Sequence, residues 1–199
     1  NEMCGAEHCQ KLQTPPAQFS VETVDSASTT AVAPSVEKDA LLCSLDGDAD
    51  RIVFHLFGGI NNTGWVLYDG DKIACLMAEF LKTELLAAGL IGEGVSNAFS
   101  FGVVQTAYAN GASSDYLRKC NIDVVFAKTG VKYCHKLAHD SFDCGVYFEA
   151  NGHGTVLFSD AIVAAIRTKY SNYTTTSDSS SDRKYKAFKR LHVSVCVIY

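Results

Sequence analysis

The densest group of side chains able to do chemistry lies at residues 46–51, which read DGDADR and directly follow a short apolar run. Asp46, Asp48 and Asp50 alternate with a glycine and an alanine, whose small size lets the carboxylates turn toward one point. Carboxylates gather in this way around a positive group, and hard oxygen ligands select Mg²⁺ or Ca²⁺ over zinc. A solvated Asp-Gly turn is the alternative. The third aspartate and the following Arg51 favour a divalent-cation site.

Two known loop types that resemble this hexapeptide fit it poorly. An EF-hand needs glycine at loop position six and glutamate at twelve, where this chain has Arg51 and Phe57, so that interpretation fails. A haloacid-dehalogenase-type phosphatase also places Asp-x-Asp after a strand, with the first aspartate as nucleophile. It usually has threonine or valine where Asp50 stands here. Metal-dependent release of phosphate by the chain would support this phosphatase hypothesis.

A second group follows another apolar run, at residues 148–155, which read FEANGHGT. Glu149, Asn151 and His153 alternate, and the intervening glycines let the backbone approach a ligand closely. A carboxylate, an amide and an imidazole together offer acceptors and donors suited to sugar hydroxyls or to an amide. An ordinary turn is the competing interpretation.

A third group, KTGVK at residues 128–132, stands where a strand is expected to give way to a helix. A lysine and free backbone N–H groups at such a junction can hold a phosphate, which makes Lys128, Thr129 and Gly130 candidates. The segment is not a Walker A loop, because the leading glycine and its spacing are absent. A plain surface lysine is equally compatible with the pattern.

The elements that must position these groups are short. Apolar runs predict strands at 41–45, 52–57 and 65–68, and a helical period from Asp71 to Leu85 predicts a helix with Gly89 just past its end. Beyond it, strands at 101–105, 124–127, 145–148 and 155–158 alternate with helices at 113–119 and 132–139. This alternation predicts an α/β fold with a mixed, mostly parallel sheet and flanking helices.

The length of 199 residues allows one domain or two small ones, and the 47% hydrophobic content supports a sizeable core. We expect a first domain at 1–68, including a loop at 11–40, and a second at 69–170. Serine, threonine and aspartate dominate 171–182, so we expect the tail at 171–199 to be of low complexity and disordered.

The net charge and the cysteine content limit which partners and which cellular compartment are expected. The net charge of −5 argues against nucleic acid, and neither a membrane span nor a signal peptide is evident, so we expect a cytoplasmic protein. The eight cysteines include no Cys-x-x-Cys pair, and Cys43, Cys75 and Cys144 sit in apolar runs, which predicts reduced core thiols. The start at Asn1 suggests a segment of a longer chain.

Six stretches in collinear order resemble the α-D-phosphohexomutase superfamily and, within it, the eukaryotic phosphoacetylglucosamine mutases. They read CGAE, LDGDADRIV, DGDKIA, GVVQTAYANG, KTGVK and GVYFEANGHGTVLFS, and they extend over about residues 1–160. Any one of them would be a weak signal, whereas six in register are a strong one.

The resemblance implies roles for the three groups. Asp46, Asp48 and Asp50 would bind Mg²⁺, and Arg51 would be a catalytic residue beside the reacting phosphate. The sugar-reading loop would contain the three alternating residues Glu149, Asn151 and His153. The active-site loop would contain Lys128, Thr129 and Gly130. The implied fold is that of phosphohexomutase domains, here the end of the second domain and the third.

The resemblance also implies an activity: Mg²⁺-dependent phosphoryl transfer that interconverts N-acetylglucosamine 6-phosphate and 1-phosphate, for UDP-N-acetylglucosamine synthesis. The implied partner is a phosphorylated N-acetylhexosamine. Such enzymes carry a phosphoserine in a Ser-His-Asn-Pro-type loop, which this sequence lacks, so we expect the chain alone to be inactive. The alternative is a non-catalytic fragment or degenerate paralogue that keeps only a binding surface. A serine loop encoded upstream in the parent transcript would separate the two.

Overall fold

A computed structural model describes residues 3–17, 39–58, 64–174 and 183–198. The chain divides into two compact units, Asn1–Ile73 with Ala150–His153, and Ala74–Glu149 with Gly154–Tyr199. The expected domain boundary at residue 68 stays a prediction.

In the described part of the first unit, three antiparallel strands form a sheet in the order β1-β2-β3. They are β1 (Leu42–Leu45), β2 (Ile52–Phe57) and β3 (Trp65–Tyr68). Leu45 pairs with Ile52, so β1 and β2 are a hairpin whose loop is the acidic hexapeptide. All three strands match the apolar runs in the sequence.

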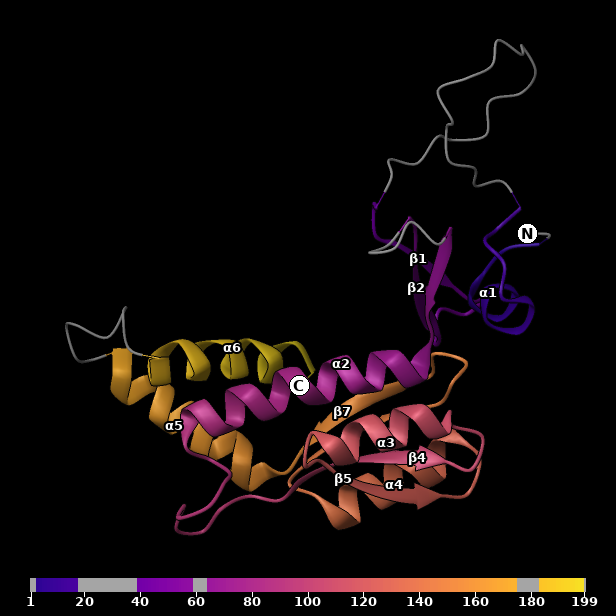
Figure 1. Cartoon of the computed structure of the whole chain (residues 1–199). Helices are drawn as coiled ribbons and strands as arrows, with labels where there is room; N and C mark the ends of the chain where they lie inside the picture. Colours follow the sequence, from indigo (N-terminus) through magenta and orange to yellow (C-terminus); the bar gives the residue numbers. More distant parts are fainter. Residues whose placement is uncertain (1–2, 18–38, 59–63, 175–182, 199) are drawn as a thin grey trace. The chain divides into compact units, whose positions relative to one another are not determined.

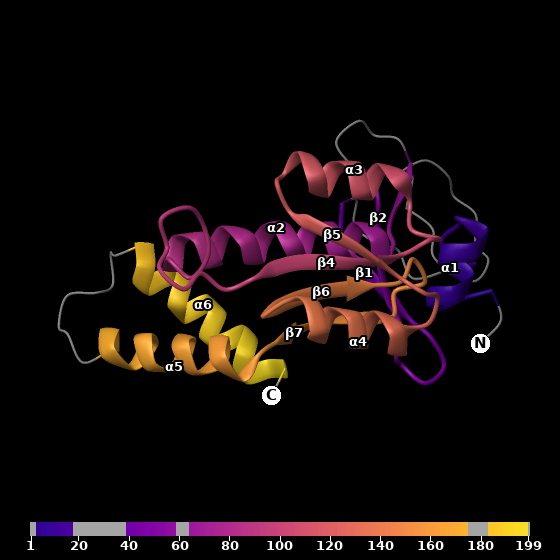
Figure 2. The same cartoon turned by 90° about the horizontal axis from the view of Figure 1, so that it is seen from below.

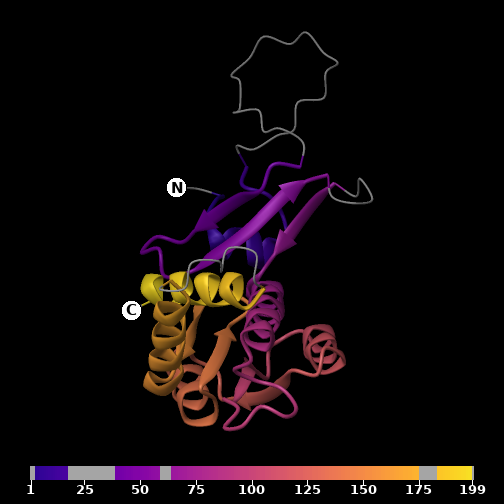
Figure 3. The ribbon, with the colours of Figure 1, turned by 90° about the vertical axis from the view of Figure 1, so that its left-hand side faces the viewer.

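A short helix, α1 (Ala6–Leu12), covers one face of this sheet, as Figure 3 shows in indigo behind the purple strands. Its buried Ala6 and Cys9 pack with Val53 and Leu67. No apolar pattern in the sequence predicts this helix. It anchors the strands that carry the acidic loop.

The second unit contains a sheet with strand order β5-β4-β6-β7 in its described residues. The strands are β4 (Phe101–Thr106), β5 (Asp123–Ala127), β6 (Cys144–Phe148) and β7 (Gly154–Phe158). β4 runs parallel to β5 and to β6, whereas β7 is antiparallel to β6. The predicted α/β fold with a mixed, mostly parallel sheet and flanking helices is confirmed.

Two helices of this unit follow strands of the sheet, α3 (Gly111–Lys119) and α4 (Val131–Ser141) (Figures 1 and 2). α4 packs its buried Cys134 and Ala138 against Val104 of β4 and Tyr147 of β6. This packing fixes the start of α4, where the KTGVK segment lies, against the sheet.

The long helix α2 (Gly70–Ala88) was predicted from its period. It begins in the first unit and continues in the second. Gly89 has a φ of +67°, the left-handed conformation that ends a helix, so its predicted position is confirmed. No helix in the described ranges is long and apolar enough to cross a membrane.

The tail differs from the prediction. α5 (Asp160–Thr174) extends past residue 170, and α6 (Arg183–Ile198) lies beside it (Figure 2). α6 buries Phe188 and Leu191, and Arg190 lies 2.7 Å from Glu84 of α2. The expectation of a disordered tail is therefore wrong for residues 183–198, because apolar residues at helical spacing find a packing surface on α5. Residues 175–182 lie outside the described ones.

The expectation of buried thiols holds only in part. Cys144 is buried, Cys75 is half-buried, and Cys43 is exposed because β1 turns it away from the side packed against α1. Cys9 and Cys134 are buried instead. The free thiols in the described residues include these five and also Cys4 and Cys120.

Candidate functional site

The acidic loop closes the β1–β2 hairpin and brings its carboxylates together. One ligand oxygen from each of Asp46, Asp48 and Asp50 lies within 4.8 Å of the others. The backbone N–H of Ala49 donates to the carbonyl of Asp46 at 3.2 Å, and Ala49 itself has a φ of +60°. This tight turn makes the alternating side chains converge.

Arg51 compensates part of the negative charge. Its Nε lies 3.2 Å from Oδ2 of Asp46 and 3.7 Å from Oδ1 of Asp50. Its backbone N–H also donates to Oδ1 of Asp46 at 3.1 Å. The arginine thus orients two of the three carboxylates from the edge of the loop.

The carboxyl groups titrate differently within this cluster. Burial raises the pKa of Asp46, but hydrogen bonds from the Arg51 backbone and the Asp50 side chain outweigh it, and its pKa lies below the usual value. Burial and the contact with Asp46 raise the pKa of Asp50, against the lowering effect of His153. The opposite pKa shifts place the first proton of the pair on Asp50, because two adjacent carboxylates resist being ionised together.

The donor set fits Mg²⁺. The converging atoms are all carboxylate oxygens, the hard ligands that Mg²⁺ and Ca²⁺ prefer. Asp46 is 12% exposed and Asp50 44%, which leaves an open side for a further ligand or water. Mg²⁺ bound to a protein usually keeps several water ligands, for which this open side leaves room.

Residues 150–153 belong to the same compact unit as the acidic loop. The carbonyl of Gly152 accepts the N–H of Ile52 at 3.1 Å, and that of Ala150 accepts the N–H of Gly70 at 3.2 Å. Gly152 has a φ of +90°, and a Cβ there would stand 2.2 Å from the carbonyl oxygen of Ile52. Glycine is required at this position, since only its backbone approaches β2 so closely.

Two predicted site residues extend from this segment. The Oδ1 of Asn151 accepts the backbone N–H of His153 at 3.0 Å. Nδ1 of His153 lies 3.5 Å from Oδ2 of Asp50. The structure thus brings Asn151 and His153 together with the acidic loop.

Glu149 has a different neighbourhood, in the second unit. Its Oε1 accepts the backbone N–H of Gly130 at 2.9 Å. Gly130 is the residue that precedes α4, so the carboxylate occupies a free donor at a helix start. Lys128 and Thr129 of the same segment are exposed. Although Glu149, Asn151 and His153 alternate in the sequence, they do not share contacts. Glu149 binds the start of α4, whereas Asn151 and His153 lie with the acidic loop.

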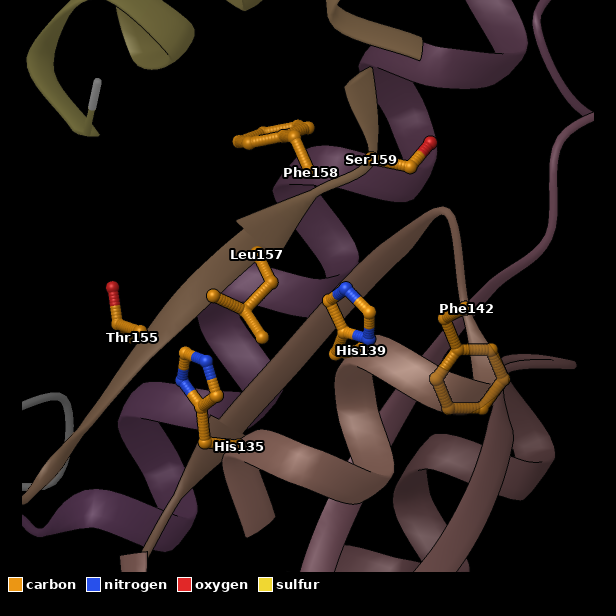
Figure 4. A pocket seen from close by; sticks show the side chains of 7 residues that line it. All are labelled: His135, His139, Phe142, Thr155, Leu157, Phe158 and Ser159. Carbon is orange, nitrogen blue, oxygen red and sulfur yellow. The ribbon is translucent and has the colours of Figure 1, made fainter. Parts of the chain in front are cut away.

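Sequence reasoning missed a cavity between α4 and β7 (Figure 4). Its volume is about 570 Å³, and His135, His139 and Leu157 are among its lining side chains. Nδ1 of His135 lies 3.1 Å from the hydroxyl of Tyr147. The two histidines stand one helical turn apart, a spacing that could have drawn attention to this face. No predicted site residue lines it.

The profile of the family described as phosphoacetylglucosamine mutase AMG1, domain III, matches residues 69–198. The chain belongs to this family. It is 42% identical to a phosphoacetylglucosamine mutase of Arabidopsis thaliana over 96% of this chain and 31% of the relative. It is 41% identical to the human phosphoacetylglucosamine mutase over 96% of this chain and 30% of that protein. The chain thus spans about a third of the length of these relatives.

Solved structures of the α-D-phosphohexomutase superfamily share the fold. An N-acetylglucosamine-phosphate mutase in a product complex matches with a TM-score of 0.74 at 34% identity, over 96% of this chain and 30% of that one. The Aspergillus fumigatus N-acetylphosphoglucosamine mutase, in complex with GlcNAc-6P and magnesium, matches with a TM-score of 0.71 at 34% identity, over 96% of this chain and 32% of that one. The resemblance inferred from the six sequence stretches is confirmed.

Proposed function

We propose that this chain supplies the magnesium-binding and sugar-reading parts of a phosphoacetylglucosamine mutase. The activity of the whole enzyme would interconvert N-acetylglucosamine 6-phosphate and 1-phosphate by phosphoryl transfer. The convergence of the three carboxylate oxygens within 4.8 Å carries this proposal, together with membership of the family. The magnesium in the A. fumigatus enzyme's complex supports the choice of metal.

In this proposal Asp46, Asp48 and Asp50 hold the metal. Mg²⁺ bound there would neutralise the charge of a phosphoryl group in transfer. Arg51 already contacts Asp46 and would place its guanidinium beside the same phosphate. The arginine would thus have two tasks: it orients a metal ligand and stabilises the negative charge of the substrate.

Asn151, His153 and Glu149 would form the sugar-reading loop. Because Oδ1 of Asn151 accepts the His153 N–H, its amide NH₂ is the group that it can offer to a sugar. An acetamido carbonyl or a ring hydroxyl would accept from it. One oxygen of Glu149 accepts the N–H of Gly130, and the second oxygen can accept a hydrogen bond from a sugar hydroxyl.

The segment Lys128–Gly130 would contribute to phosphate binding. The carboxylate of Glu149 occupies the Gly130 N–H, so Lys128 is the group of this segment best suited to an anion. Its exposed side chain is compatible with that role.

A graft tests the proposal, because residues 1–199 contain no Ser-His-Asn-Pro-type loop to carry the phosphoryl group. The corresponding segment of an intact relative is replaced with residues 1–160 of this chain, and mutase turnover is measured. We expect turnover with Mg²⁺ and no turnover by the isolated chain. A well-folded graft that binds Mg²⁺ and sugar phosphate without turnover would favour the degenerate, binding-only alternative. Turnover by the isolated chain would contradict the assignment of the phosphoryl donor.

A further inference from the structure

The imidazole of His153 faces Asp50, one of the three carboxylates of the acidic loop. This contact adds a role to the one that its position in the sugar-reading loop suggests. Nδ1 of His153 lies 3.5 Å from Oδ2 of Asp50, while Nε of Arg51 lies 3.7 Å from Oδ1 of the same carboxylate. Each oxygen of Asp50 therefore has its own nitrogen neighbour. Two nitrogens on opposite oxygens restrict rotation of a carboxylate more than one does.

We propose that His153 is a positioning residue for Asp50, which it holds in the orientation that completes the metal site. The inference rests on the proposed function, since it takes the acidic loop to be that site. It assigns the loop after β6 a second task, which is to support a metal ligand as well as to read the sugar.

The backbone around His153 is suited to such a role because it is fixed at three points. Its own N–H donates to Oδ1 of Asn151, the carbonyl of Gly152 accepts from Ile52, and the carbonyl of Ala150 accepts from Gly70. Ile52 directly follows Arg51, so its hydrogen bond with Gly152 attaches the segment at 150–153 to the base of the acidic loop. Because this backbone is already fixed, the contact with Asp50 costs only the rotamer entropy of the His153 side chain.

The charge balance favours the same role. Asp46, Asp48 and Asp50 repel one another, and Arg51 contacts only the first and the last of them at salt-bridge distance. A second nitrogen on Asp50 helps to keep its carboxylate in the cluster. Groups that orient metal ligands in this way typically change metal affinity roughly tenfold to a hundredfold when they are removed.

Side-chain replacements can separate this role from a merely structural one. An asparagine amide nitrogen can occupy the place of Nδ1, whereas a glutamine amide reaches toward the place of Nε2. His153→Asn should therefore retain the contact to Asp50, and His153→Gln and His153→Ala should lose it. All three variants remove the ring, so loss of packing alone would affect them alike.

The test is calorimetric titration of Mg²⁺ into the full chain and its variants, with thermal unfolding as the control for folding. We expect His153→Ala and His153→Gln to weaken Mg²⁺ binding roughly tenfold, and His153→Asn to bind like the wild type. Equal affinity in all four proteins, or equal loss in all three variants, would overturn the inference. Wild-type binding that Asp48→Asn leaves unchanged would overturn the proposed metal site and the inference with it. Normal, Asp48-dependent binding with no effect of His153 would overturn the inference alone.

Discussion

The acidic loop at 46–51 and the segment at 128–132 both lie where a strand ends, but they handle charge in opposite ways. In the acidic loop, three carboxylates converge and Arg51 compensates only part of their charge. In the other segment, one carboxylate, Glu149, accepts a backbone N–H at the start of α4. The first arrangement leaves negative charge that Arg51 does not balance, whereas in the second the carboxylate and the N–H form a hydrogen bond with each other.

Unbalanced charge distinguishes the acidic loop from the segment at 128–132. A helix start with an exposed lysine looks like a phosphate site in the sequence, yet part of its donor capacity is already used by Glu149. Converging like charges cost free energy, which Arg51 offsets in part and a bound cation would offset further.

Loss of a central carboxylate should have the largest effect. We expect Asp48→Ala to abolish Mg²⁺ binding by the chain and to abolish turnover of the grafted enzyme for every sugar phosphate, because the remaining oxygens cannot hold the metal. Calorimetry and a coupled mutase assay measure the two effects. Lys128→Ala is the matched change in the other segment and should leave Mg²⁺ binding intact. Retained metal affinity in Asp48→Ala would remove the basis of the comparison.

The backbone contact that holds residues 150–153 at the acidic loop predicts a large effect on stability. Gly152→Ala places a Cβ 2.2 Å from the carbonyl oxygen of Ile52 at a φ of +90°. We expect a loss of about 3 kcal/mol in the free energy of unfolding. Chemical denaturation measures it.

Gly47→Ala is the control for that variant, since a Cβ there meets nothing within 4 Å. It should change the stability by less than about 0.5 kcal/mol. Similar stabilities for the two variants would mean that the close approach of Gly152 to β2 does not exist in solution.

Asn151→Ala should affect the sugar and spare the metal. Loss of a buried hydrogen-bond partner costs about 1–3 kcal/mol, so kcat/KM of the graft for the acetylated substrate should fall roughly tenfold to a hundredfold. The Mg²⁺ requirement should not change, because the backbone hydrogen bonds from Ile52 to Gly152 and from Gly70 to Ala150 remain and still hold the segment of His153 beside Asp50. A shifted Mg²⁺ requirement would contradict this division. Equal losses with glucose phosphate would assign Asn151 to hydroxyls common to both sugars.

Glu149→Ala should destabilise the chain less than Gly152→Ala does. It removes the acceptor for the Gly130 N–H at the start of α4, which is worth about 1 kcal/mol at a helix N-terminus. Thermal or chemical unfolding of the chain measures it. Glu149→Gln keeps an acceptor oxygen and should recover most of the loss. If both substitutions destabilise the chain equally, the charge of Glu149 matters more than its hydrogen bond.

The strands and α2 could be predicted from the sequence because their apolar patterns are local. α1 could not, since its seven residues bury only Ala6 and Cys9. The expected start of α3 at residue 113 is two residues late, because Asn110 caps the helix by accepting the N–H of Ala112. α6 was missed because its apolar positions become informative only against the packing surface that α5 provides.

The candidate site shows the same limit. Alternation of aspartates in a six-residue loop is local, and it predicted the convergence of Asp46, Asp48 and Asp50. The contacts of Glu149 with Gly130 and of His153 with Asp50 join segments distant in the sequence, so no periodicity reports them. The alternation of Glu149, Asn151 and His153 predicts one group, whereas in the structure Glu149 has separate contacts from the other two.

We propose above that the acidic loop at 46–51 is a metal site. Crystals of the chain soaked in Mn²⁺, an anomalous scatterer that shares the oxygen preference of Mg²⁺, test it most directly. We predict an anomalous peak coordinated by carboxylate oxygens of Asp46, Asp48 and Asp50, and no peak there in the Asp48→Asn variant. A peak only at another group of residues, or none at saturating Mn²⁺, would contradict the account.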